Sequence, residues 1–210
     1  MSPVICLVTD RQRFGPRWEA PLLSRVAAAA AAGVSLVQIR ERDLDGRALL
    51  DLTTRVLDAV RGTCTRVVVN ERADVARAAG AHGVHLRGAS MSAERIRAWA
   101  GRPWVIGRSV HGRDEAVEEA RGGALDYLLF GTVFETSSKP GRMAAGIDAL
   151  AEACGATPLP VLAIGGVTAT TARRVASAGA AGIAVMGLFA DTEPSAMADL
   201  VARLRESFVA

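Results

Sequence analysis

The sequence predicts a compact (β/α)8 barrel, and three observations indicate this fold class. Short apolar, β-branched runs alternate with longer stretches rich in Ala, Arg and Glu. There are eight such strand–helix units, spaced by about 25 residues, which is typical of parallel βαβ units closed into a barrel. The chain has 210 residues, which suits one domain, and we expect that domain to span residues 1–210. An open doubly wound sheet is the alternative. We disfavour it because no G-x-G-x-x-G follows the first strand and glycines recur at the last two strands.

Each expected strand is an apolar run, and each is followed by a helical stretch. The strands are expected at 3–9, 34–40, 66–70, 83–86, 104–109, 126–131, 161–164 and 182–185. The helices are expected at 18–32, 46–61, 73–79, 92–100, 113–121, 149–154, 168–178 and 195–208. The first helix is ended by Gly33. The longest stretch without a clear element is 132–146, and a long loop in a compact domain usually has a function.

Composition and charge exclude several classes of protein. Half of the residues are hydrophobic, which excludes a disordered chain. No apolar run approaches the 18–20 residues of a membrane span, and no secretory signal is visible. The net charge is +3 and 4% of residues are aromatic, so no nucleic-acid partner is expected. The three cysteines are far apart, which disfavours a disulfide framework or a zinc site and favours the cytoplasm.

In such a barrel the active site lies at the carboxyl ends of the strands. Gln38, Arg40 and Arg42 alternate onto one face at the end of the second strand. An amide and guanidinium groups suit a phosphate or a carboxylate, because arginine offers a planar fork of donors. The alternative is a rim of ion pairs, with Glu41 and Asp43 as partners.

Three further residues follow strand ends or lie on strands. Asn70 ends the third strand and could donate to a substrate or cap the next helix. We expect His85, on the fourth strand, to be a core histidine. His111 follows the fifth strand, where a histidine suits proton transfer near neutral pH. A histidine on a surface loop is the alternative reading.

The loop after the sixth strand carries hydroxyl groups and the only lysine in a chain with 25 basic residues. Thr136 and Ser138 supply hydroxyls, and Lys139 supplies a point charge. We expect these three residues to contact substrate, and a solvated loop is the alternative.

Glycines follow the seventh and eighth strands. Gly165, Gly166, Met186 and Gly187 occupy the loops that usually bind phosphate in such barrels. Glycine lets backbone N–H groups approach an anion. The sequence therefore predicts a phosphate site here, with glycines that only serve tight turns as the alternative. No cluster has the spacing of metal ligands.

At these strand ends the sequence resembles the thiamin phosphate synthase/TenI superfamily. The matching segments cover almost the whole chain in order: 33–42, 67–74, 80–86, 106–111, 126–131, 160–167 and 178–186. The resemblance implies a compact (β/α)8 barrel that forms a homodimer.

The superfamily has two branches. Thiamin phosphate synthase joins a hydroxymethylpyrimidine diphosphate to thiazole phosphate, with Mg²⁺ holding the diphosphate. Its usual pattern places acidic residues after the third and fourth strands, where this chain has Glu71 and Ser90. Mg²⁺ needs one or two carboxylates in place, and the serine disfavours this branch.

The chain is similar to the other branch, the TenI-type thiazole tautomerases, at 106–111 and 129–136. We therefore expect a thiazole tautomerase that isomerises an exocyclic thiazole carboxylate phosphate to its aromatic tautomer, without metal or cofactor. The resemblance implies that His111 transfers the proton, and that Arg40, Asn70 and Lys139 line the pocket. The alternatives are a Mg²⁺-dependent thiamin phosphate synthase and a regulator that binds thiazole phosphate without catalysis.

Overall fold

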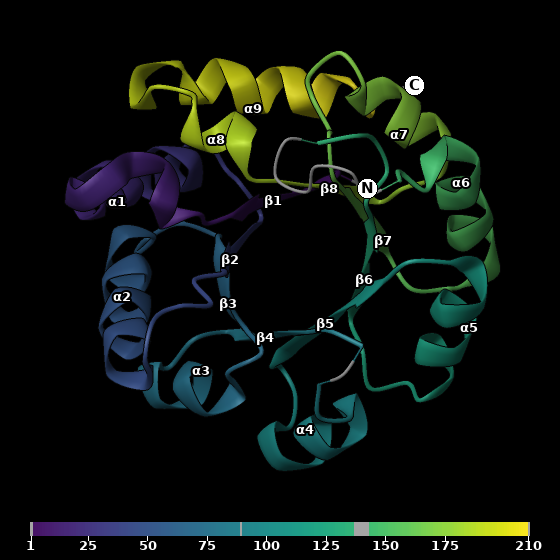
Figure 1. The fold of residues 1–210 in the computed structure, drawn as a ribbon, viewed down its shortest axis with the longest axis horizontal. Coiled ribbons are helices and arrows are strands. Elements are labelled where there is room, and N and C mark those ends of the chain that lie inside the picture. Colours follow the sequence, from purple (N-terminus) through teal and green to yellow (C-terminus); the bar gives the residue numbers. More distant parts are fainter. Residues whose placement is uncertain (1, 89, 137–142, 210) are drawn as a thin grey trace.

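The computed structural model describes residues 2–88, 90–136 and 143–209. Eight parallel strands pair in chain order and close into a barrel, with helices around the outside (Figure 1). The predicted (β/α)8 fold is therefore confirmed. The strands are β1 (Val4–Val8), β2 (Leu36–Ile39), β3 (Arg66–Asn70), β4 (Gly83–Leu86), β5 (Val105–Val110), β6 (Tyr127–Gly131), β7 (Val161–Ile164) and β8 (Gly182–Val185).

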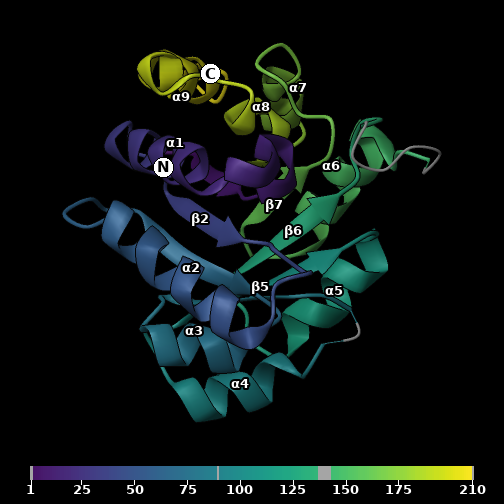
Figure 2. The same cartoon turned by 60° about the vertical axis from the view of Figure 1, so that its left-hand side comes forward.

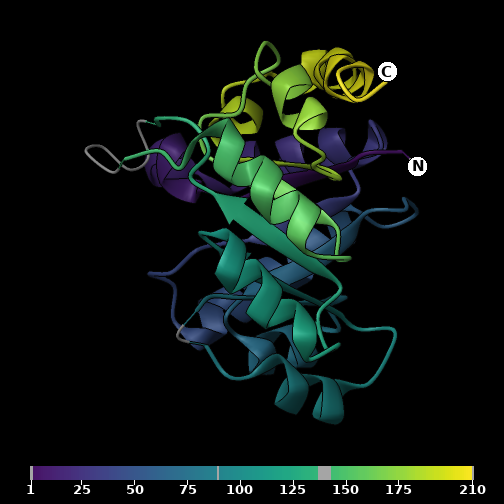
Figure 3. The same ribbon diagram turned by 90° about the vertical axis from the view of Figure 1, so that its right-hand side faces the viewer.

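The helices form the outer layer of the molecule. They are α1 (Glu19–Ala31), α2 (Gly46–Ala59), α3 (Ala73–Ala79), α4 (Ala93–Ala100), α5 (Arg113–Arg121), α6 (Gly146–Ala156), α7 (Ala172–Ser177), α8 (Gly187–Ala190) and α9 (Met197–Glu206). Figure 2 shows α1, α2 and α3 following one another around one side, where neighbours are in contact. Figure 3 shows α5 and α6, also in contact, on the opposite side.

The strands are apolar on both faces because both faces are buried. In β3, Val67 and Val69 belong to the core between sheet and helices, whereas Val68 belongs to a separate cluster with Cys6 and Leu36 from the two preceding strands. Alternate residues of a strand point to opposite faces, so this second cluster fills the inside of the barrel. The barrel is thus a packed core that is closed below its mouth, which we define as the end where the carboxyl ends of the strands lie.

The structure departs from the predicted elements mainly where segments are short. Two 3₁₀ segments, η1 (Arg11–Arg17) and η2 (Pro194–Ala196), and the four-residue α8 have too few residues to show a helical period. The helix predicted at 168–178 begins later, because Thr168 and Thr171 exchange side-chain and backbone hydrogen bonds that replace the first helical turn. No described helix combines the length and apolar character that a membrane crossing requires.

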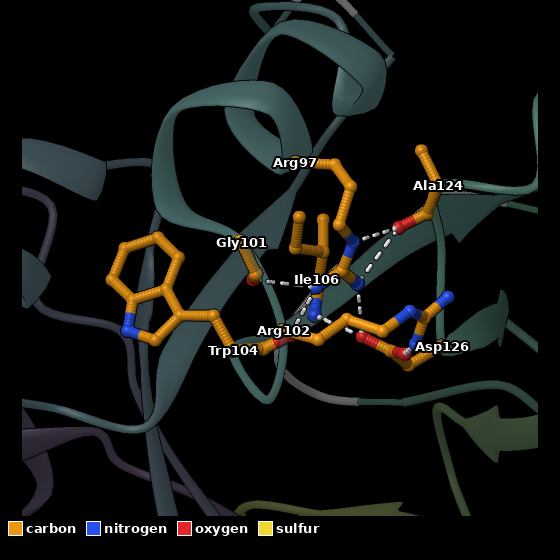
Figure 4. Close-up of polar contacts among 7 residues, drawn as sticks. All are labelled: Arg97, Gly101, Arg102, Trp104, Ile106, Ala124 and Asp126. Carbon is orange, nitrogen blue, oxygen red and sulfur yellow. Dashed lines mark hydrogen bonds and ion pairs between the residues drawn. The ribbon is translucent and has the colours of Figure 1, made fainter.

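An arginine ties the amino ends of β5 and β6 to α4, at the opposite end from the mouth (Figure 4). Arg97 donates to the carbonyl oxygens of Ala124 and Trp104 and forms an ion pair of 2.6 Å with Asp126. Asp126 also accepts the backbone N–H of Ile106 at 2.8 Å. A single carboxylate therefore satisfies a guanidinium and a strand N–H group together.

We expect Asp126→Ala to lower the free energy of unfolding by about 2 kcal/mol, because it leaves the backbone N–H of Ile106 without its acceptor and the partly buried Arg97 guanidinium without its carboxylate partner. Urea denaturation measures this change. The control is Glu118→Ala, which breaks an exposed pair with Arg121 and should change stability little. Equal losses in the two variants would contradict the role given to Asp126.

Candidate active site at the mouth of the barrel

A cavity of about 660 Å³ opens at the mouth, between the loops that follow β1, β2, β6, β7 and β8. It brings together six of the residues predicted from the sequence: Arg40, Thr136, Gly165, Gly166, Met186 and Gly187. Ser138 and Lys139 lie outside the described residues. The cavity has arginines on its β2 side and glycine loops on its β7 and β8 side.

The arginines of the β2 side keep their charges free for a ligand. Glu41 accepts the backbone N–H of Arg11, and Asp43 forms a 2.6 Å ion pair with the Arg11 side chain. Burial raises the pKa of Glu41. Among the described residues, no carboxylate oxygen lies within ion-pair distance of Arg40 or Arg42. The alternative of an ion-paired rim is therefore wrong for these two arginines, because η1 supplies a different partner for the acids.

Beneath the arginines lies a pair of amides inside the barrel. Gln38 Nε2 donates to Asn70 Oδ1 at 3.0 Å, and α3 has no side-chain cap, so Asn70 does not cap it. Gln38 is buried, and its Oε1 atom has no hydrogen-bond partner among the described residues. A buried acceptor without a partner costs free energy. This atom is thus suited to accept a hydrogen bond from a bound ligand.

A second polar chain crosses the barrel interior. His85 Nδ1 lies 3.0 Å from the Tyr127 hydroxyl, and Nε2 lies 2.9 Å from Ser109 Oγ. Burial, reinforced by the charges of Arg108 and Arg40, lowers the pKa of His85 to about 3. The imidazole is therefore neutral near pH 7, and the prediction of a core histidine is confirmed. Ser109, at one end of this chain, was not predicted from the sequence. It alternates with Gly107 on β5, and this alternation indicates a side chain inside the barrel.

The ends of β3 and β4 are joined by a cluster of three residues that we call the Glu71 cluster: Glu71, Arg87 and Ser90. The Arg87 guanidinium pairs with Glu71 Oε2, and the Ser90 hydroxyl donates to Oε1. Ser90 Oγ also accepts the Arg87 backbone N–H at 2.7 Å. Burial alone would raise the pKa of Glu71, but the bonds from Arg87 and Ser90 lower it. Both carboxylate oxygens therefore already have partners.

The predicted phosphate loop after β7 requires its glycines. Gly165 has a φ of 99° and Gly166 a φ of 63°, both in the left-handed region. A Cβ on Gly165 would lie 2.4 Å from the Thr132 side chain, and one on Gly166 would lie 2.4 Å from the Glu135 carbonyl oxygen. Because α7 begins only at Ala172, the loop itself, and no helix terminus, presents backbone to the cavity here.

Arg13 lies close to the loop after β8, and it was not predicted from the sequence. A Cβ on Gly187 would lie 3.5 Å from Arg13 Nη2, and Arg13 also lines the cavity. Arg13 pairs with Asp191 through two contacts of 2.8 Å. Gly187 begins α8, and the first N–H groups of a helix have no partner within it. The only signal in the sequence was the run of arginines after the first strand.

His111 is exposed at the end of β5 and does not line the cavity. Its backbone N–H donates to Glu115 at 2.7 Å, and Nδ1 lies 2.5 Å from the Gly131 carbonyl oxygen. A carbonyl oxygen only accepts, so Nδ1 carries a proton in this contact. In the neutral ring Nε2 is then the atom able to take up a proton. The catalytic role of His111 stays a prediction.

Several known proteins with similar sequences are named thiamine-phosphate synthase. The chain is 36% identical to the thiamine-phosphate synthase of Roseiflexus castenholzii, covering 87% of this chain and 79% of the relative. It is 35% identical to that of Chlorobium luteolum, over 91% and 87% of the two chains. The structure superposes on the thiamine phosphate pyrophosphorylase from Pyrococcus furiosus with a TM-score of 0.82 and 28% identity, over 98% and 95% of the chains.

These relatives overturn the predicted thiazole tautomerase activity. They favour the alternative reading, thiamin phosphate synthase, over nearly the full length of the chain. The prediction was wrong because it treated the serine at position 90 as a marker of the other branch. The structure shows that this serine donates to Glu71, while Arg40 and Arg42 line the cavity at the mouth without an ion-pair partner among the described residues.

The family assignment rests on the match along the chain. The family model described as TMP-TENI, thiamine monophosphate synthase, matches residues 5–189. This range includes every strand except the first residue of β1, Val4, and every lining residue of the cavity except Asp191. The protein therefore belongs to the TMP-TENI, or thiamine monophosphate synthase, family of enzymes.

Proposed function

We propose that this protein is a transferase of thiamine biosynthesis, a thiamine-phosphate synthase. The reaction joins hydroxymethylpyrimidine to thiazole phosphate and releases the diphosphate that the pyrimidine carried. It requires one site for a diphosphate and another for a phosphate, close enough for the two heterocycles to meet. The similarity to synthases over 87–91% of the chain supports this assignment.

The observation that carries the proposal is that one cavity holds two anion-binding sides. Arg40 and Arg42 stand on the β2 side, without carboxylate partners in the described part of the chain. Gly166 and Gly187 stand on the opposite side, with Arg13 close to Gly187. Guanidinium forks and free backbone N–H groups are the two common ways in which proteins bind phosphate. Two such sides suit two phosphorylated substrates.

Polar groups of the barrel interior are suited to orient the heterocycles. The unpartnered Gln38 Oε1 accepts a hydrogen bond from a donor on the pyrimidine, and its amide is held in place by Asn70. Ser109 is held by His85 in the same way. Holding two reactants in a fixed geometry lowers the entropic part of the barrier. The guanidinium groups of the β2 side stabilise the negative charge that grows on the departing diphosphate.

The resemblance also implies Mg²⁺, and the residues do not fit a magnesium site held by the protein. Ser90 is neutral, and both oxygens of Glu71 already accept hydrogen bonds from Arg87 and Ser90. Within the described residues, no group of three His, Cys, Asp or Glu side chains could hold a metal. No step of the reaction is therefore assigned to a metal here.

Turnover of both substrates to thiamine phosphate tests the proposal, and Arg40→Ala tests the site. We expect this variant to lower kcat/KM by about 10- to 100-fold, because charge-assisted hydrogen bonds to phosphate are lost. The control is Arg203→Ala, which removes an exposed arginine from α9 and should keep wild-type activity. Binding of thiazole phosphate without any turnover would overturn the proposal and favour the regulatory alternative.

A further inference from the structure

We propose that this protein binds the diphosphate group through arginines alone, with no need for a divalent cation, and that the Glu71 cluster is the structural reason. This inference rests on the proposed function, because it concerns the diphosphate side of the same site. Two guanidinium groups carry it, Arg40 and Arg42 at the end of β2, while Arg87 at the end of β4 pairs with Glu71.

The first step of the argument is that the carboxylate is already in use. Arg87 and Ser90 each bind a different oxygen of Glu71, and Ser90 is bound in turn by the Arg87 backbone. The Glu71 backbone N–H also donates to the His85 carbonyl oxygen at 2.8 Å. Mg²⁺ demands a nearly regular octahedral shell and binds through free carboxylate oxygens, phosphates and water. A metal ion would therefore compete with Arg87 or Ser90 at either oxygen of Glu71.

The second step is the charge of the region. Arg40 and Arg42 bring two positive charges to the β2 side of the cavity, and the Glu41 and Asp43 carboxylates beside them are held by Arg11. Burial and the repulsion from Arg40 and Arg87 lower the pKa of Arg42, whereas the Glu71 charge raises it. Between Arg40 and Arg42 a divalent cation would meet two positive charges, whereas a diphosphate would relieve the repulsion between them.

The third step is the match between donor and ligand. Arginine offers a planar fork that binds two phosphate oxygens at once, and it stays charged at any physiological pH. Two acids that could have neutralised Arg40 and Arg42, Glu41 and Asp43, contact Arg11 instead. The arginines thus supply both the charge and the geometry that a metal ion supplies elsewhere.

Calorimetric titration with inorganic pyrophosphate tests the inference, first in EDTA and then in excess Mg²⁺. We expect wild-type protein to bind pyrophosphate in EDTA with an affinity within about threefold of that in Mg²⁺. An affinity that falls by tenfold or more in EDTA would overturn the inference. Arg42→Gln should weaken binding in EDTA at least tenfold, and the exposed Arg203→Gln should leave it unchanged.

A variant that should require Mg²⁺ for pyrophosphate binding gives a second test. Ser90→Asp places a carboxylate beside Glu71 and removes the hydroxyl donor, so binding should weaken in EDTA and recover when Mg²⁺ is added. The matched control is Ser92→Asp, which adds the same charge two residues away at the N-cap of α4, where aspartate is also a good cap. If Ser90→Asp gains no dependence on Mg²⁺, the role given to the Glu71 cluster is wrong.

These outcomes separate the inference from the proposed function. Pyrophosphate binding in EDTA without turnover would leave the arginine site standing and reject the synthase. Turnover together with binding that requires Mg²⁺ would keep the synthase and reject the arginine site. Thermal unfolding of each variant shows whether a loss of binding comes from a loss of fold.

Discussion

Replacing Gly166 with alanine is expected to destabilise the protein and to raise the KM for thiazole phosphate at the same time. The φ of 63° places Gly166 in the left-handed region, which costs other residues roughly 1–2 kcal/mol. The new Cβ would also lie 2.4 Å from the Glu135 carbonyl oxygen, so backbone must move, at a cost of roughly 1–3 kcal/mol. The sum predicts a loss of about 2–5 kcal/mol in the free energy of unfolding.

The movement should reach the ligand because the two loops are joined. Phe134 N–H donates to the Gly165 carbonyl oxygen at 3.0 Å, and Val133 N–H donates to that of Ile164 at 3.0 Å. Urea denaturation and steady-state kinetics on the same preparation measure both effects. Gly155→Ala is the control, since a Cβ on this helical glycine meets nothing within 4 Å. A Gly166→Ala protein with wild-type stability and KM would show that this loop does not hold the phosphate.

The stability of the protein should fall steeply as the pH drops from about 6.5, because of the buried His85. Its pKa of about 3 in the folded state lies below the ordinary value of 6.5. Between these values the unfolded chain binds more protons than the folded one, so acid favours unfolding. The linkage predicts a slope that approaches about 1.4 kcal/mol per pH unit, or about 2 kcal/mol in total between pH 6.5 and 4.5, with the full contribution present above pH 6.5.

Denaturation at a series of pH values measures this slope against His85→Gln. The amide side chain does not titrate, so the variant should be less stable at pH 7 but should lose about 2 kcal/mol less between pH 6.5 and 4.5. The contribution of carboxylates such as Glu71 to the free energy of unfolding falls in acid in both proteins, so it cancels in the comparison. Parallel slopes would mean that His85 is not the group that titrates.

The fold could be predicted because each strand is apolar on both faces, which is the pattern of a parallel sheet between helices and a packed interior. The bounds of β3, β4, β7 and β8 match their predicted ranges. The helix at 168–178 was misplaced because threonine hydroxyls bind the backbone locally. Such competition depends on side-chain geometry, which the hydrophobic period does not report.

The cavity could be predicted as far as it depends on the strand ends. Arg40, Gly165 and Gly166 line it because the end of a strand fixes where the next residues lie. The partner of an arginine is not fixed in this way. The alternative reading paired Glu41 with the arginines of its own strand end, yet it accepts hydrogen bonds from Arg11, which lies 30 residues earlier and is brought near by η1.

The wrong choice between the two branches has a similar cause. It treated residue 90 as an isolated ligand position, whereas in the fold this residue belongs to a hydrogen-bonded unit with Glu71 and Arg87. Whether a site has lost a function depends on the whole set of charges around it. That set is assembled from β2, β3 and β4, and it becomes visible only when the strands are placed side by side.

The closure of the barrel also has a consequence for how the chain folds. Val4 on β1 pairs with Gly182 on β8, a contact between residues about 180 positions apart. Closing a loop of this length costs roughly 5 kcal/mol of chain entropy, whereas each of the other strand pairs joins consecutive strands. Until β8 has been synthesised, β1 has one open edge, and unpaired edges are where strands of different molecules associate. The chain is therefore most prone to associate with other chains during its synthesis, before β8 has left the ribosome.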